Sequence, residues 1–215
     1  MKKIFLIAGI IAISVSTQAQ TSFGIQAGAN IASQKGEEDN ISIKSDSKVG
    51  LVIGALAEID FGSSISFRPE LNFIQKGSKF DEDGYKLTQT LNYIELSPNF
   101  VYNIPAGTGY VFLGLGPSFG FGLSGKYKAT ETGFPEEKGD IKFGNDEVND
   151  DFKSFDFGLN LLGGYKMSNG IFLSAGYNLG LANLALGDTD GFSVKNRGFS
   201  IKIGYMFGGR PAASK

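Results

Sequence analysis

The chain has 215 residues, a net charge of −2 and 41% hydrophobic residues, which excludes a disordered chain and argues against a nucleic-acid partner. It contains no Cys and no His, so nucleophiles that rely on a His base and zinc sites built on these two residues are excluded as well. The 31 glycines, about twice the usual share, require a structural reason.

The N-terminus predicts a cleaved secretory signal peptide over residues 1–19. Two lysines precede an apolar run from Ile4 to Val15, and Thr17-Gln18-Ala19 places small residues at the −3 and −1 positions of a signal peptidase site. Roughly a dozen apolar residues fall short of the ~20 that a membrane-spanning helix needs. We therefore expect cleavage after Ala19 and a single mature domain over 20–215.

The mature chain predicts strands, because apolar and polar residues alternate and almost no helical period is present. We expect eight strands, at 21–32, 48–60, 64–76, 88–102, 110–123, 152–166, 170–182 and 197–207. Their connections alternate in length, being long near 33–47, 77–87, 124–151 and 183–196 and short near 61–63, 103–109 and 167–169. An outer-membrane barrel has short periplasmic turns and long outer loops. The sequence thus predicts an all-β fold, an eight-stranded antiparallel up-and-down transmembrane β-barrel.

The direction of the strand faces decides between this barrel and a soluble sheet. In a soluble sheet the apolar face packs inward, whereas in an outer-membrane barrel it meets lipid. In the strand at 110–123, the face opposite the apolar residues is largely glycine. Glycine packs nothing on a solvent-exposed face, but it suits the concave wall of a narrow barrel. We therefore expect the apolar faces outside and the polar faces in the lumen.

Several motifs along the mature chain carry a family resemblance. They are "FGIQAGANIA", "FRPELNFIQKG", "LNYIELSPNFVY" and "FLGLGPSFGFG". With them the chain resembles the PorT-like outer-membrane β-barrel family typical of Bacteroidetes, often described as porin-like. The resemblance implies a barrel in the outer membrane more directly than it implies an activity. Pro69 and Pro98 lie within predicted strands and each removes a ladder donor, which predicts a bulge or bend near them.

The inward faces also predict an ionic network that plugs the lumen. The expected members are Glu58, Arg68, Glu70, Glu95, Asp156, Asn160 and Lys202. Counted from the short turns, Arg68 lies at a depth where it can share its five donors with two or three of these carboxylates. Buried charges are tolerated when they are paired, so a structural network is the first interpretation. A selectivity ring of a channel and an acid–base pair of carboxylates are the alternatives.

The long connections are rich in acidic residues. The segment 124–151 carries eight carboxylates, and Asp-x-Asp-Gly turns occur at 81–84 and 188–191. Such oxygen ligands suit Ca²⁺ or Mg²⁺, but Asp-Gly is first a turn signal and the downstream Glu of a calcium loop is missing. We expect solvated loops, of which 124–151 is long enough to carry a binding function.

Taken together, the sequence predicts a monomeric, non-enzymatic outer-membrane barrel with a structural or surface-interaction role. No catalytic residue, metal ligand or cofactor is expected. The expected partners are outer-membrane lipid and lipopolysaccharide, with the barrel-assembly machinery acting during insertion. A small-solute porin is the main alternative, and an accessory component of a secretion apparatus is a further one.

Overall fold

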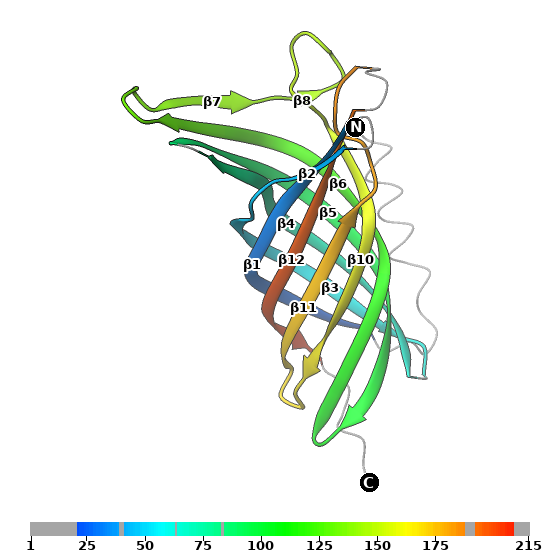
Figure 1. Ribbon diagram of the computed structural model, residues 1–215. Helices are drawn as coiled ribbons and strands as arrows, with labels where there is room; N and C mark the ends of the chain where they lie inside the picture. The colour runs from blue at the N-terminus through cyan, green and yellow to red at the C-terminus, as the bar shows by residue number, and fades with distance from the viewer. Residues whose placement is uncertain (1–20, 39–40, 63, 83, 188–191, 209–215) are drawn as a thin grey trace.

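The computed structural model describes residues 21–38, 41–62, 64–82, 84–187 and 192–208, so the predicted signal peptide lies outside the described residues. Eight strands form a closed antiparallel ring (Figure 1): β1 (Thr21–Glu38), β3 (Lys48–Asp60), β4 (Ile65–Glu82), β5 (Tyr85–Ala106), β6 (Gly109–Glu131), β10 (Phe155–Lys166), β11 (Ile171–Gly180) and β12 (Ser193–Phe207). Each strand pairs with the next along this order, and β12 returns to pair with β1. The predicted eight-stranded up-and-down barrel is confirmed. Within the described residues, no helix is long and apolar enough to cross a membrane.

Four short strands lie at the end of the barrel that carries the long connections. They are β2 (Ile41–Lys44), β7 (Glu137–Ile141), β8 (Phe143–Gly144) and β9 (Phe152–Lys153). β2 extends the edge of β1, β7 extends the edge of β6, and β8 pairs with β9 in parallel.

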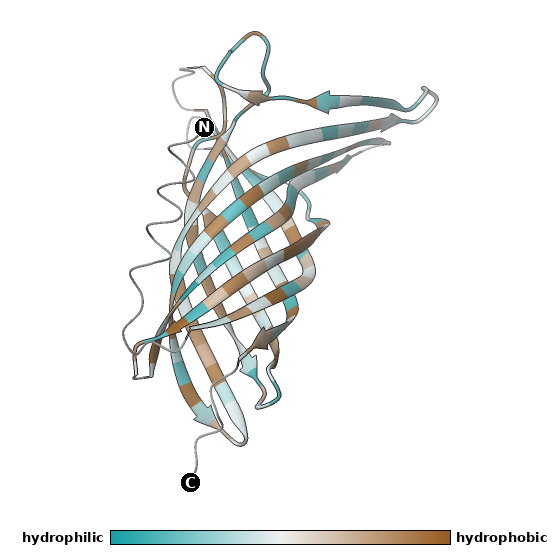
Figure 2. Ribbon diagram, turned by 180° about the vertical axis from the view of Figure 1, so that it is seen from behind, coloured by the Kyte–Doolittle hydropathy of each residue, from teal (hydrophilic) through white to brown (hydrophobic). Residues whose placement is uncertain are grey.

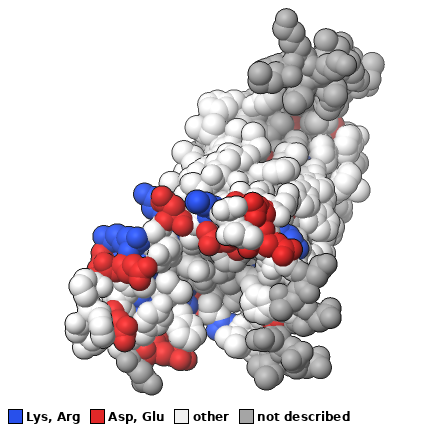
Figure 3. Space-filling view, turned by 90° about the horizontal axis from the view of Figure 1, so that it is seen from above, with Lys and Arg blue, Asp and Glu red and all other residues white. Residues whose placement is uncertain are grey.

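The strand faces have the predicted directions. Leu113 and Leu115 are more than half exposed, whereas Phe112, the residue before them, is fully buried in the lumen. The same alternation places Arg68 and Glu70 inside and Leu71 outside. The outer wall is therefore lined by large apolar side chains. Hydrophobic and hydrophilic residues alternate along the strands (Figure 2), and charged side chains gather at the loop end in the view from above (Figure 3).

Glycines let the strands and the lumen side chains come close together. A Cβ added to Gly28 would lie 2.0 Å from the carbonyl oxygen of Ile201 on the neighbouring strand. A Cβ on Gly204 would lie 2.3 Å from the ring of Phe172. The excess of glycine therefore reflects a wall with too little room for side chains on its inner face.

The expected bulge at the prolines is wrong. Pro69 pairs with Pro98 across β4 and β5, and residues on either side keep one register and one inward parity. The prolines have no backbone N–H, and pairing is interrupted beside them between β3 and β4 and between β5 and β6. Between β3 and β4 the pairing continues with Ile59 opposite Phe67, in unchanged register. Two facing prolines thus remove hydrogen bonds without inserting a residue.

A bulge lies instead between β5 and β6 near the loop end. Asn92 pairs with Ser124 and Tyr93 pairs with Gly122, which leaves Leu123 as an extra residue. A bulge bends a strand and increases its twist. Beyond it the ends of β4, β5 and β6, together with β7, project to one side of the barrel (Figure 1).

We call this projecting part the flared sheet, formed by residues 78–82, 85–91, 125–131 and 137–141. It corrects the prediction that 77–87 and the first part of 124–151 are solvated loops. The strands continue past the apolar band with polar residues on both faces, so the apolar alternation that marks a half-buried strand fades there.

A pair of glycine substitutions on β1 tests the crowding argument. Gly28→Ala should destabilise the barrel by about 1 to 3 kcal/mol, because the added methyl group meets the backbone of β12. Gly36→Ala is the matched control, since its nearest atom would be 3.8 Å away. The measurement is urea unfolding in detergent, followed by the gel shift between folded and unfolded forms. Equal stability of the two variants would contradict the crowding argument.

Candidate functional site

The lumen is the most distinctive feature of the structure, because it holds charged side chains in ion pairs. Nearest the short turns, Glu58 lies between two cations. Arg68 donates its Nε to Glu58 Oε2 at 3.1 Å, and Lys166 donates Nζ to Glu58 Oε1 at 3.1 Å. The guanidinium of Arg68 also lies 4.2 Å from the ring centroid of Phe112. Both oxygens of this carboxylate are thus neutralised by residues of β4 and β10.

The middle of the lumen holds a second pair, Glu70 of β4 and Lys202 of β12. Lys202 Nζ lies 2.6 Å from Glu70 Oε2, and Gln26 donates Nε2 to the same oxygen at 2.8 Å. Gln26 also donates to Asn72 at 2.8 Å. In the ring the strand order is β12, β1, β3, β4. Lys202 and Gln26 therefore reach Glu70 through the lumen, from three strands and two strands away.

A third group lies nearer the loops and has one cation between two carboxylates. Lys76 Nζ lies 2.7 Å from Glu95 Oε2 and 2.9 Å from Asp156 Oδ2. Asn196 donates Nδ2 to the same Asp156 oxygen at 3.0 Å. Lys76 also lies 5.2 Å from the ring centroid of Tyr93.

The ion pairs differ from the expected network. Arg68 is predicted to share its donors among two or three carboxylates, but Glu58 is its one ion-pair partner among the described residues. Glu70 is held by Lys202 and Glu95 by Lys76. The predicted member Asn160 instead donates its Nδ2 to Asn99 Oδ1 at 3.0 Å.

Two cations of the network, Lys76 and Lys166, are absent from the predicted set. The alternation of inward and outward residues is enough to place both in the lumen. Lys76 lies an even number of residues from Glu70 on β4, and Lys166 lies an even number from Asp156 on β10. With them, the ion pairs of the lumen join four carboxylates to four cations: Glu58, Glu70, Glu95 and Asp156 with Arg68, Lys76, Lys166 and Lys202. Lys48 is buried as well, but it donates to the carbonyl oxygen of Val49. Within the ion-paired set the formal charges cancel, although the group at the short turns has an extra positive charge and the group at the loops an extra negative one.

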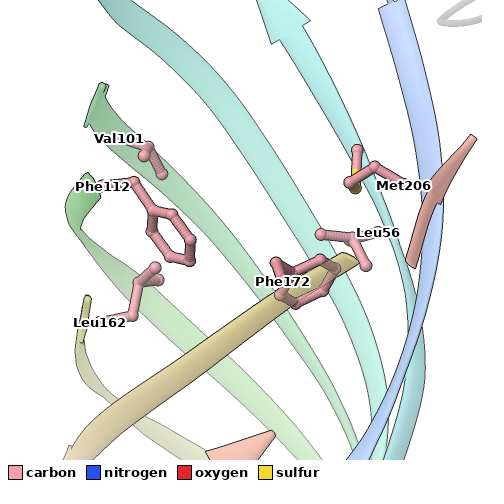
Figure 4. Packing of buried hydrophobic residues seen from close by; sticks show 6 residues of the cluster. All are labelled: Leu56, Val101, Phe112, Leu162, Phe172 and Met206. Atoms are coloured by element: carbon pink, nitrogen blue, oxygen red, sulfur yellow. The ribbon is translucent and has the colours of Figure 1, made fainter. Parts of the chain in front are cut away.

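Two apolar clusters fill the remaining length of the lumen. Near the short turns, Val101, Phe112 and Leu162 face Leu56, Phe172 and Met206 (Figure 4). All six side chains are buried. This cluster packs beside the group of Arg68, whose guanidinium covers the Phe112 ring.

The second cluster closes the mouth at the loop end. Val52, Ile74, Leu91 and Tyr93 from the barrel pack with Ile141, the last residue of β7. The ring of Phe143 packs edge-on against Tyr93, with 5.3 Å between centroids. Gly122 leaves room for this ring, since a Cβ there would lie 2.5 Å from it. Part of the predicted loop 124–151 therefore folds over the mouth.

Little space remains between these layers. A cavity of about 20 Å³ lies near Glu70, Asn72 and Lys202, which is enough for roughly one water molecule. Each lumen carboxylate is held by a cation, so none is placed as a free acid or base. In the part of the chain that the structure describes, no group of three Asp or Glu residues could hold a metal ion.

The sequence matches a known protein family. A family model described as "Outer membrane protein beta-barrel domain" matches residues 18–186. Neisserial surface protein A has a similar structure, with a TM-score of 0.45 and 15% identity over 87% of this chain and 99% of that one. The attachment invasion locus protein Ail of Yersinia pestis, in complex with the heparin analogue sucrose octasulfate, gives a TM-score of 0.40 and 15% identity over the same shares. No curated protein matches the sequence.

A pair of double-mutant cycles tests the observed pairing of Arg68. Removing Arg68 with Arg68→Met should cost about 3 to 5 kcal/mol, as expected for one side of a buried ion pair. Combined with Glu58→Gln, the loss should be smaller than the sum of the single losses by about 1 to 3 kcal/mol. Combined with Glu70→Gln, the coupling should be weaker than with Glu58→Gln, because Glu70 pairs with Lys202 and Arg68 acts on it only through its charge. Urea unfolding read from the gel shift measures all of them, and stronger coupling to Glu70 than to Glu58 would refute the assignment.

Proposed function

Since this chain belongs to the family of outer membrane protein beta-barrel domains, we propose that it is a non-enzymatic barrel with a plugged lumen and a surface-interaction role at its loop end. The observation that carries the proposal is the filling of the lumen. Four ion-pair partners of each sign and two apolar clusters occupy the lumen, and the cavity beside Glu70 has a volume of about 20 Å³. A conducting pore needs a continuous wet path.

The absence of His and the pairing of the carboxylates support a role without catalysis. General acid–base chemistry needs a titratable group within reach of a substrate, and Glu58 and Glu70 are buried and bonded to cations. The loop end, in contrast, exposes a sheet and turns that partners can reach.

Three further features are part of the proposal. The motifs around Arg68–Gly77 support membership of the PorT-like group, and Lys2 to Ala19 supports secretion with cleavage after Ala19. The apolar outer band supports contact with outer-membrane lipid and lipopolysaccharide as a monomer. Insertion would then depend on the barrel-assembly machinery.

Electrical recording tests the plug. Purified protein in a planar bilayer should give no steady ion conductance, because charged and apolar layers block the lumen at three depths. Steady wild-type conductance, with a cation selectivity that changes in Arg68→Ala, is the result expected for a porin. That result would replace the plugged barrel by the alternative function.

Proteolysis of intact cells tests the orientation. Glutamyl endopeptidase should cut after Glu147, which is exposed in the turn between β8 and β9. The variant Glu147→Gln should lose this fragment, which mass spectrometry identifies. Cleavage at Glu147 only after the outer membrane has been permeabilised would mean that the loop end faces the periplasm.

A further inference from the structure

The flared sheet has two faces of different chemistry. Residues paired across strands lie on the same face, and Phe80, Leu87, Ala129 and Glu137 form one such row. The next row outward is Glu82, Tyr85 and Glu131. We call this the apolar-acidic face, made of Phe80, Tyr85, Leu87, Tyr127, Ala129, Glu82, Glu131 and Glu137.

The opposite face carries the lysines. Alternation places five of them there, together with two aspartates: Lys79, Lys86, Lys126, Lys128 and Lys138 with Asp81 and Asp140. We call it the lysine face. The ion pair of Lys86 with Asp81, at 2.6 Å, agrees with this parity. On the apolar-acidic face no Lys or Arg is present among the described residues of the flared sheet.

The carboxylates of the two faces also differ in their partners. Glu136, in the turn before β7, bonds to Lys128 and Lys138, and these hydrogen bonds lower the pKa of its carboxyl. Glu137 instead accepts a hydrogen bond from the Tyr127 hydroxyl at 2.9 Å. Among the described residues, neither Glu82 nor Glu131 forms an ion pair. Negative charge on the apolar-acidic face is therefore uncompensated within the sheet.

The apolar part of this face is accessible. Phe80 and Tyr85 are both more than a third exposed, at 37% and 39%, although both belong to the paired ends of β4 and β5. Aromatic side chains exposed together on a rigid sheet are typical of interface centres, and charged residues form the rim of such interfaces.

We propose that the apolar-acidic face is the docking surface for a cationic polypeptide that carries apolar side chains among its Lys or Arg residues. The apolar stripe would take the partner's apolar side chains, and Glu82, Glu131 and Glu137 would pair with its cations. A polyanion such as a sulfated or phosphorylated glycan would meet three carboxylates on this face and is disfavoured there. The inference rests on the proposed surface role but not on the plugged lumen.

A binding experiment with a defined probe tests the inference. The probe is a fluorescein-labelled twelve-residue peptide of alternating Lys and Leu, and its anisotropy is measured with the full-length protein in zwitterionic nanodiscs, with empty nanodiscs as the blank. Wild-type protein should bind this peptide and leave the matching Glu and Leu peptide unbound. Binding should weaken with added salt, because exposed charge pairs are screened.

Two triple variants with the same change in charge separate local recognition from general electrostatics. Glu82→Gln, Glu131→Gln and Glu137→Gln together should weaken binding about tenfold, since three exposed ion pairs are lost. Asp81→Asn, Glu136→Gln and Asp140→Asn together remove three charges from the lysine face or its edge and should change the affinity less than about twofold. Heat-dependent gel mobility verifies that each variant is folded.

The apolar contribution has its own test. The double variant Phe80→Ser with Leu87→Ser should lower the affinity for the Lys and Leu peptide. It should leave the weak binding of poly-lysine unchanged. Equal effects of the two charge triples, or no binding by wild-type protein, would overturn the inference. So would concentration-dependent self-association lost in the first triple, because the occupant would then be the lysine face of a second copy. The peptide-binding results do not depend on whether the lumen is blocked, so the conductance measurement in a planar bilayer tests the plugged lumen separately.

Discussion

The narrowness of an eight-stranded ring is the constraint on which the rest of this structure depends. Its interior is just wide enough for side chains, so an inward-facing charge has almost no water to solvate it and must find an opposite charge across the ring. Lys202 reaches Glu70 and Lys166 reaches Glu58 in this way. The same constraint explains the glycines, because a wall position such as Gly204 has no space for a side chain once Phe172 occupies the lumen.

Alternation along the chain was enough to predict the ring and the direction of its faces. It placed Phe112, Arg68 and Glu70 inside, and these are among the most buried side chains of the barrel. What alternation cannot supply is the partner of each charge, which depends on strand tilt and on side-chain length across the lumen. Arg68 therefore pairs with Glu58 where two or three carboxylates were expected, and Lys76, which is absent from the predicted set, spans Glu95 and Asp156.

The loop end was harder to predict for a different physical reason. Outside the apolar band neither face of a strand has to be apolar, so the period that identifies β4 to β6 disappears while their hydrogen bonding continues to Glu82, Tyr85 and Glu131. The prolines show the converse. Pro69 and Pro98 suggested a break in the strands, but they lie opposite one another, and the register between β4 and β5 is the same on both sides of them.

The closure of the ring between β1 and β12 has a consequence for how the barrel forms. Phe23 pairs with Phe207, so the contact that completes the cylinder joins residues near opposite ends of the described chain. Such a contact has a high loop-closure entropy cost, and topologies dominated by distant pairings fold slowly. Until β12 is in place, both β1 and β11 would expose unpaired backbone groups, which the hydrocarbon of a bilayer cannot satisfy. A nascent chain that ends before β12 is therefore an open curved sheet with two unpaired edge strands. Pairing of the fifteen residues of β12 closes the barrel and satisfies the backbone groups of both edges.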